Sequence, residues 1–204
     1  MGRIVVSQNI SLDGVVKDPM GLEGFAHGGW LVQVTDRDRE AWAEFGLEEA
    51  LSSQGMLVGR RSYEFLAERW PARTGEWADR LNSYPKYVVS STLTDPAWNN
   101  TTVLGGELAE EIANLKASVD GDIVVPASGQ LVQDLLARHL VDELRLMVYP
   151  FLLGGRFSLF AESSGRTPLR LVDSRRLGDS LALLTYEVLP APANSREAGG
   201  AGSS

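Results

Sequence analysis

Residues 123–140 read IVVPASGQLVQDLLARHL, and this stretch decides the fold class. Its first three residues form a short apolar segment with the length and composition of a buried strand. Small residues follow, and then the apolar pair Leu131 and Val132 is repeated four residues later by the apolar pair Leu135 and Leu136. This spacing predicts a helix over 129–140 with one apolar face. The stretch is therefore a strand–loop–helix unit, which is typical of α/β proteins.

Apolar segments alternate with helical ones over most of the chain. We expect strands at 4–10, 56–58, 87–90 and 102–104, and helices at 36–52, 60–70, 76–82 and 107–117. The helix that begins near Arg60 should break at Trp70-Pro71, because proline cannot continue it. This alternation predicts a mostly parallel sheet covered by helices on both faces.

The last part of the chain has a different pattern. Apolar segments at 144–149, 169–177 and 181–188 follow one another with little helix between them, and Gly178-Asp179 is typical of a tight turn. We therefore expect an antiparallel hairpin at the end of the sheet. Residues 191–204 are small, polar and rich in glycine, so they cannot bury enough apolar surface to offset chain ordering. The sequence thus predicts one domain over 1–190 and a disordered tail.

Length, composition and charge exclude several classes of protein. The 204 residues are 44% hydrophobic, which suffices for one continuous core. No stretch approaches the roughly eighteen apolar residues of a membrane helix, and the N-terminus does not resemble a signal peptide, so we expect a cytoplasmic protein. The absence of cysteine excludes thiolate catalysis and cysteine-based metal sites. The net charge of −8 opposes general binding to nucleic acid, so any phosphate site must be local.

The sequence lacks the motifs of several common enzyme classes. Neither GxGxxG nor GxxxxGK[ST] occurs, which argues against a Rossmann dinucleotide-binding enzyme and a P-loop NTPase. His27 and His139 are the two histidines, and neither belongs to an HExxH motif, while a GxSxG elbow is also missing. We therefore expect no metal site and no serine-hydrolase chemistry.

Small and phosphate-compatible residues follow three of the predicted strands, at 59–62, 90–92 and 127–130. The carboxyl ends of parallel strands meet at one edge of a sheet, where α/β proteins bind their ligands. At 59–62 a glycine precedes two arginines that can pair with a phosphate. Each motif also has a simpler explanation: a solvated helix start at 59–62, a turn at 90–92, and tight strand–helix packing at 127–130. Their convergence favours a nucleotide site.

The order of these motifs resembles a known family. SLDG at 11–14 is followed by GRRSYE at 59–64, SS at 90–91, SG at 128–129, VDELRL at 141–146 and LLGG at 152–155. This set is similar to the dihydrofolate reductase-like superfamily, and most of all to the reductase domain of the riboflavin-synthesis deaminase-reductases and its stand-alone bacterial relatives. The resemblance covers nearly the whole chain up to residue 188 and implies a dihydrofolate reductase-like three-layer α/β fold.

The resemblance also implies NADPH as the hydride donor. It assigns the contacts as follows: Arg60, Arg61 and Ser62 at the adenosine 2′-phosphate, Ser90 and Ser91 beside the adenosine, and Ser128, Gly129, Gln130 and Leu131 along the pyrophosphate. Gly59, which allows close approach of the backbone, is the further cofactor-binding candidate. The sequence departs from the family pattern at 126–129, where dihydrofolate reductases carry two or three glycines and this chain has one.

Four further residues are candidates for catalysis and substrate binding. Asp13 ends the first strand and either contacts a ligand or forms a turn. The family places a carboxylate in its first helix, where Asp36 is our choice among Asp36, Asp38, Glu40 and Glu44, although an N-cap explains an aspartate there equally well. Trp30 and Phe151 are candidates for the substrate wall, with core packing as the alternative.

Three functions are compatible with these residues. The first is an NADPH-dependent reductase that transfers a hydride to a small heterocyclic acceptor, such as a pterin or a pyrimidine-derived compound. The second is a non-catalytic nucleotide-binding or sensor module of the same fold, and the third is a dimerisation domain without ligand. We also expect a homodimer, because residues 144–149 and 151–160 are more apolar than a sheet edge exposed to water should be.

Overall fold

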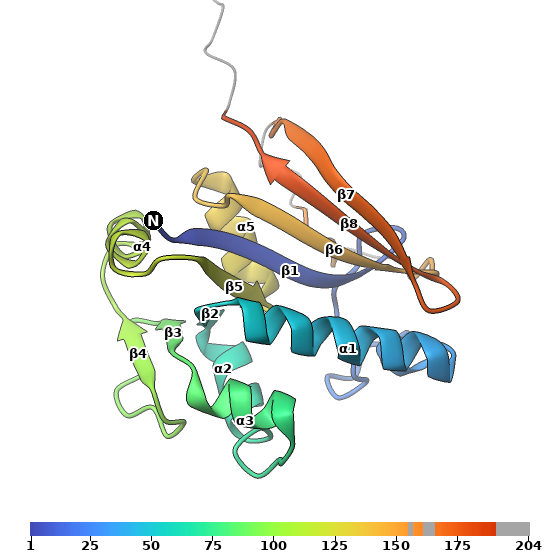
Figure 1. Cartoon of the computed structure of the whole chain (residues 1–204), viewed down its shortest axis with the longest axis horizontal. Helices are drawn as coiled ribbons and strands as arrows, with labels where there is room; N and C mark the ends of the chain where they lie inside the picture. Colours follow the sequence, from blue (N-terminus) through green and yellow to red (C-terminus); the bar gives the residue numbers. More distant parts are fainter. Residues whose placement is uncertain (155–156, 161–165, 191–204) are drawn as a thin grey trace, which may run out of the picture.

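The computed structural model of the chain describes residues 1–154, 157–160 and 166–190 (Figure 1). The tail predicted at 191–204 and Gly155 of the LLGG motif lie outside the described residues. No helix in the described ranges is long and apolar enough to cross a membrane.

Strands and helices alternate along the chain as the sequence predicts. The strands are β1 (Arg3–Ser11), β2 (Gly55–Gly59), β3 (Lys86–Val89), β4 (Thr101–Leu104), β5 (Asp122–Pro126), β6 (Glu143–Tyr149), β7 (Leu169–Leu177) and β8 (Leu181–Val188). The helices are α1 (Asp36–Ser52), α2 (Arg60–Ala67), α3 (Glu76–Ser83), α4 (Leu108–Ser118) and α5 (Gly129–Ala137), with a short 3-10 turn at Trp30–Val32.

The strands form one sheet in the order β4-β3-β2-β5-β1-β6-β8-β7 within the described residues. The pairs from β4 to β6 are parallel, whereas β8 pairs antiparallel with both β6 and β7. The predicted fold class is therefore confirmed: a mostly parallel α/β sheet that finishes in an antiparallel hairpin. Gly178 takes the positive φ that the tight turn of this hairpin requires.

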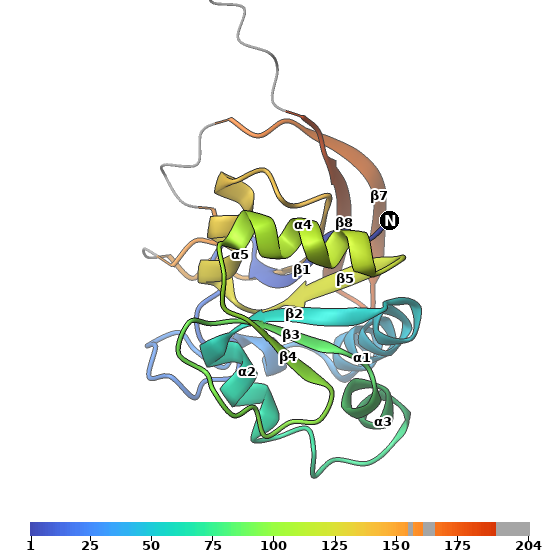
Figure 2. The same ribbon diagram turned by 90° about the vertical axis from the view of Figure 1, so that its left-hand side faces the viewer.

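Helices cover both faces of the sheet, which gives three layers (Figure 2). On one face α4 and α5 pack on the strands through residues such as Leu57, Val125 and Leu135. On the other face α1, α2 and α3 cover the alternate side chains, including Met56 and Val58. Because side chains alternate along a strand, each central strand is apolar on both faces.

Three sequence predictions need correction. The helix expected to continue to Trp70-Pro71 already ends at Ala67, with Glu68 as its C-cap. The helix predicted to end at residue 140 ends at Ala137, because Arg138 is its C-cap and His139 has a φ of 56°. Residues 144–149 were expected at a sheet edge that needed a partner subunit, but β6 lies between β1 and β8. Its apolar side chains, such as Leu144 and Met147, are buried within the chain itself.

Asp38 fastens the start of α1 to the C-terminal hairpin. Thr35 caps the helix, and its hydroxyl and the Asp38 carboxylate form a reciprocal capping box. The same carboxylate accepts the amide protons of Asp179 and Ser180 at 2.7 and 2.9 Å, and the Ser180 hydroxyl at 2.7 Å. Burial alone would raise the pKa of Asp38, but these hydrogen bonds outweigh it and lower the pKa to about 2.

Replacing Asp38 by alanine should lower the free energy of unfolding by about 2–3 kcal/mol, because three amide groups and the Ser180 hydroxyl lose a charged acceptor. The pKa of Asp38 falls from 3.8 to about 2 on folding, so its stabilisation is complete above pH 4 and is lost as pH falls toward 2. Urea denaturation between pH 2 and 6 checks both effects. Asp36→Ala, a change in the same helical turn at an exposed carboxylate, is the control and should have little effect. Equal losses for both variants would contradict this role.

Candidate functional site

The three predicted motifs meet at the carboxyl edge of the sheet. β3, β2 and β5 are adjacent and parallel, so residues 90–92, 59–62 and 127–130 follow neighbouring strand ends. Direct contacts join them: the Gly59 amide donates to the Ser128 hydroxyl at 3.0 Å, and the Arg60 guanidinium donates to the Thr92 hydroxyl at 2.6 Å. The structure thus brings together residues that are up to 69 positions apart in the sequence.

The turn from β2 into α2 presents two arginines to solvent. Gly59 is the N-cap of α2 and gives the helix no side-chain cap, so the first amide groups of α2 lack a side-chain acceptor there. Arg60 pairs with Glu64 one turn along the helix at 2.7 Å. Arg61 is 88% exposed and lies 3.6 Å from the Glu23 carboxylate of the loop after β1. The two guanidinium groups are accessible and are held by carboxylates that an anion can replace.

The loop from β5 into α5 holds an unusual backbone shape. Ala127 and Ser128 have φ values of 56° and 62°, a left-handed conformation that glycine adopts more easily. Ser128 is the N-cap of α5 but does not cap it with its side chain. The buried Gln8 side chain supports the loop by donating to the carbonyls of Val125 and Ala127. The loop therefore keeps the first turn of α5 open to an anion although it has lost the glycines of the family pattern.

Not every predicted residue at this edge offers its side chain to a ligand. Ser90 uses its hydroxyl to accept the amides of Thr92 and Leu93 at 3.2 and 3.0 Å, which is a turn-forming role. Ser91 and Gln130 are exposed, whereas Ser62 is half-buried. The remaining member, Leu131, packs in the core, so only its backbone can face a ligand.

Asp13 organises the end of β1. Its carboxylate accepts the Ser11 hydroxyl at 2.5 Å and the amides of Leu153 and Gly154 at 3.1 and 2.7 Å. The Ser11 hydroxyl and then these amides hold the pKa of Asp13 below its usual value, so the group stays ionised. Asp13 therefore joins the turn after β1 to the segment after β6 and does not hold a proton near neutral pH.

The other predicted catalytic and substrate residues have different environments. Asp36 has an 86% exposed side chain that pairs with Arg39. Trp30 is 1% exposed and donates its indole N–H to the carbonyl of Lys17 at 3.0 Å. Phe151 is half-buried and packs against the same apolar cluster as Trp30. Trp30 thus seals the loop after β1 onto the sheet.

A buried hydroxyl lies beside Trp30. Tyr149 is fully buried, its ring is 5.1 Å from that of Trp30, and its hydroxyl has no hydrogen-bond partner among the residues that the structure describes. Burial, together with the charge of Asp38, raises the pKa of Tyr149, so the hydroxyl keeps its proton. An unpaired buried donor is costly, so this hydroxyl is an unusual feature of the cluster that contains Trp30 and Phe151.

The loop of residues 15–34 is organised by a buried carboxylate that the sequence analysis missed. Asp18 accepts the amides of Leu22, Glu23 and Phe25 at 2.6, 3.0 and 3.1 Å. Burial would raise the pKa of Asp18, but these amides outweigh it and lower the pKa. The pair Asp18-Pro19 before a glycine-rich run is a turn signal that could have identified it. Likewise, the spacing of Thr35 and Asp38 is a capping-box signature.

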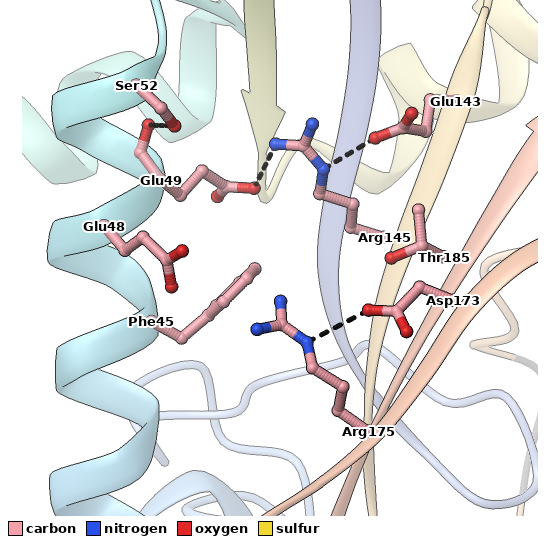
Figure 3. A pocket seen from close by; sticks show the side chains of 9 residues that line it. All are labelled: Phe45, Glu48, Glu49, Ser52, Glu143, Arg145, Asp173, Arg175 and Thr185. Atoms are coloured by element: carbon pink, nitrogen blue, oxygen red, sulfur yellow. Dashed lines mark hydrogen bonds and ion pairs between the residues drawn. The ribbon is translucent and has the colours of Figure 1, made fainter.

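A cavity of about 250 Å³ lies at the opposite edge of the sheet, where the parallel strands begin (Figure 3). Arg145 crosses it and pairs with Asp122, Glu143 and Glu49 at 2.7, 2.7 and 3.2 Å. Burial raises the pKa of Glu49 although Arg145 opposes the shift. These charges satisfy one another, so the cavity belongs to the structural framework. In the described ranges no three histidine or carboxylate side chains group in a way that could hold a metal ion.

Comparison with known proteins identifies relatives over nearly the whole chain. The family model of the RibD C-terminal domain matches residues 3–183. The uncharacterized protein YwjB of Bacillus subtilis (strain 168) is 31% identical over 174 residues, which cover 85% of this chain and 91% of YwjB. YyaP of the same strain is 24% identical over 190 residues, which cover 90% of this chain and 94% of YyaP.

Solved structures share the fold. A protein of Shewanella sp. PV-4 with a riboflavin-biosynthesis name has a TM-score of 0.72 at 24% identity, over 92% of this chain and 99% of its own. RibD of Acinetobacter baumannii has a TM-score of 0.58 at 16% identity, and this chain, matched over 93% of its length, spans 59% of it. A pyrimidine reductase-like protein of Corynebacterium diphtheriae NCTC has a TM-score of 0.57 at 13% identity, over 93% and 92% of the two chains. At such identities the likeness shows the fold alone, which is dihydrofolate reductase-like.

Replacing Ala127 by glycine should raise the free energy of unfolding by about 0.5–1 kcal/mol, because glycine adopts the left-handed conformation without steric cost. Ala113, which is exposed within α4, provides the matched control. Ala113→Gly should lower the free energy of unfolding by about 1 kcal/mol, because glycine disfavours a helix interior. Urea denaturation measures both. A loss of stability in Ala127→Gly as large as that in Ala113→Gly would show that Ala127 does not have this conformation.

Proposed function

The chain belongs to the RibD C-terminal domain family, and on this premise we propose that it is an NADPH-dependent reductase that transfers a hydride to a small heterocyclic acceptor. The family is a reductase-like one with the dihydrofolate reductase-like fold. The observation that carries the proposal is the convergence of three parallel strand ends, with Arg60 and Arg61 on the first helix turn after β2. Two accessible guanidinium groups at a glycine N-cap fit a phosphate monoester.

The residues at this edge fit a dinucleotide. Gly59 has nothing closer than 3.9 Å to the position of a Cβ, so its backbone can be approached closely. The left-handed Ala127–Ser128 pair and the uncapped start of α5 offer amide groups to a pyrophosphate. On this proposal Arg60, Arg61 and Ser62 hold the 2′-phosphate, Ser90 and Ser91 border the adenosine, and residues 128–131 follow the pyrophosphate.

When bound, NADPH would supply the hydride, and the chain has to position the acceptor, exclude water and manage one proton. Trp30 and the Asp18-organised loop close one side, and Phe151 borders the same cluster. Tyr149, whose hydroxyl keeps its proton, belongs to the same cluster, but it is fully buried and would reach an acceptor only if these side chains moved. A pterin or a pyrimidine-derived compound has the flat, polar-edged shape that such a wall would accommodate.

A second candidate function, binding of the nucleotide without catalysis, is favoured by the ionisation and pairing of the predicted carboxylates. Asp13 is ionised and fully engaged, and Asp36 is exposed and paired with Arg39, so neither is poised to donate a proton. A module of the same fold that binds the nucleotide without turning it over would need neither group. Turnover distinguishes the two functions: oxidation of NADPH with a panel of pterins, flavins and pyrimidine amino-ketones supports the reductase. Binding without any oxidation supports the module.

We further propose a homodimer that forms through β7. This outer strand pairs with β8 on one side, and eight of its nine residues are exposed, including Leu169, Leu171 and Val172. Among residues 1–154, 157–160 and 166–190 no strand pairs with the outer edge of β7, and unpaired amides and carbonyls beside exposed apolar side chains are a template for pairing with another strand. A second copy of the chain would cover it.

Leu171→Lys should convert the dimer to a monomer, because a charge at the paired edge would lose its hydration. Light scattering at micromolar concentration measures the mass. Leu51→Lys, at a leucine on α1 that is 50% exposed against 53% for Leu171, is the matched control and should stay dimeric. A monomeric wild-type chain would overturn the proposed homodimer.

The double variant Arg60→Ala/Arg61→Ala should bind NADPH at least tenfold more weakly, because two charge-assisted hydrogen-bonding groups to the 2′-phosphate are lost. Binding of NADH, which lacks that phosphate, should stay within about twofold of the wild type. Fluorescence titration measures both dissociation constants. Arg73→Ala removes an exposed arginine beyond α2 and is the control. An unchanged preference for NADPH in the double variant would mean that the phosphate lies elsewhere.

A further inference from the structure

The carboxylate of Glu23 is shared by two cations from different parts of the chain. Lys17 reaches it from the same loop, and Arg61 reaches it at 3.6 Å from the start of α2. Arg61 is the residue that the proposed function places on the cofactor phosphate. Glu23 therefore occupies the guanidinium of Arg61, with which an incoming phosphate would have to pair.

Two cations that converge on one carboxylate leave an excess of positive charge. A phosphate monoester carries close to two negative charges at neutral pH, so it matches the Lys17–Arg61 pair better than a single carboxylate does. Lys17 is partly exposed and its ammonium also stands 5.9 Å from the centre of the Phe157 ring. Both cations are thus accessible from the carboxyl edge of the sheet once Glu23 moves away.

Glu23 carries a partly exposed side chain on a backbone that the loop holds in place. Its own amide donates to the buried Asp18 carboxylate at 3.0 Å, beside the amides of Leu22 and Phe25. Gly28 lies against the same carboxylate, where an added Cβ would stand 2.5 Å from the Asp18 oxygen. The Asp18 carboxylate therefore holds the backbone from which Glu23 reaches Arg61.

The same loop also borders the other part of the proposed nucleotide site. A methyl group of Val16 stands 3.4 Å from the position of a Cβ on Gly129, at the start of α5. Phe25 packs edge-on against Phe157, with ring centres 5.5 Å apart. Glu23 and Val16 thus place the loop against two of the three phosphate-compatible motifs, 59–62 and 127–130.

We infer that Glu23 is an internal competitor for the phosphate of the cofactor and thereby determines how strongly the protein prefers a 2′-phosphorylated nucleotide. In the free protein Glu23 neutralises Arg61 and fastens the loop to α2. When the phosphate binds, it replaces Glu23 as the partner of Arg61. The loop then loses its contact with α2. The inference rests on the proposed function, because it requires the phosphate to lie on Arg61.

Glu23→Gln keeps the size of the side chain and removes its charge, so it tests the competition directly. Isothermal calorimetry with adenosine 2′,5′-bisphosphate should show two- to fivefold tighter binding than for the wild type, the range expected for an exposed ion pair. Binding of adenosine 5′-monophosphate, which lacks the 2′-phosphate, should be unchanged. Glu110→Gln alters the net charge equally at an exposed site on α4, on the other face of the sheet, and should bind both nucleotides as the wild type does.

Hydrogen exchange provides a readout that does not depend on affinity or turnover. Adenosine 2′,5′-bisphosphate should accelerate amide exchange at residues 18–25 of the wild-type chain, because the loop loses its contact with Arg61. In Glu23→Gln without nucleotide, these amides should exchange faster than in the wild type. Adding the nucleotide should then change their exchange rates little. Protection of residues 18–25 that is the same in both proteins, with and without nucleotide, would overturn the inference.

The two ideas fail in different ways. If the wild type binds both nucleotides equally and Arg60→Ala/Arg61→Ala does not change this, the proposed phosphate site is wrong. If the wild type prefers the 2′-phosphorylated nucleotide but Glu23→Gln binds it no more tightly than Glu110→Gln does, the site stands and Glu23 is not a competitor.

Discussion

The guanidinium of Arg145 joins three carboxylates that come from α1, β5 and β6. It lies where the parallel strands begin, and Arg3 of β1 extends the network to Glu143 and Asp122. Burying such charges gains little net stability over apolar packing, but an unpaired member would be very costly. The network therefore disfavours any shift in register among β1, β5 and β6 or any other seating of α1. At this edge the charges of Arg145 and its three partners are therefore neutralised within the chain.

The two edges explain how the chain divides its polar residues. At the amino edge, acidic and basic side chains approach to 2.7 Å and lie deep between α1 and the sheet. At the carboxyl edge, Arg60 and Arg61 have exposed partners on flexible side chains. An exposed ion pair contributes little to stability and is exchanged at low cost, whereas a buried one is not. The same residue types thus stabilise the fold at one edge and remain available for a ligand at the other.

The sequence determined the elements more reliably than their junctions. The helix over 36–52 and the strands at 169–177 and 181–188 were predicted with the bounds that the structure has, because capping residues, apolar segments and the Gly178-Asp179 turn are local signals. The meeting of 59–62, 90–92 and 127–130 was also predictable, since parallel strands place their carboxyl ends together. The roles of Asp18 and Asp38 were not predicted. Asp38 depends on amides 141 and 142 residues away, and Asp18 depends on the path of a loop that no periodic pattern encodes.

The charge of the whole chain bears on how an anionic nucleotide would bind. The protein carries a net charge of −8, and at physiological ionic strength a charge is felt over about 8 Å, so only nearby groups can attract a phosphate. Arg60 and Arg61 are each already paired, with Glu64 and Glu23. A phosphate that binds here replaces these carboxylates as the partner of the arginines. The electrostatic part of its binding free energy is therefore the attraction of the arginines to the phosphate minus their attraction to the carboxylates. Such a difference is larger for a doubly charged phosphate than for any singly charged group, and a ligand without the phosphate gains nothing from it. An acidic protein can in this way select a phosphorylated cofactor without a strongly basic surface.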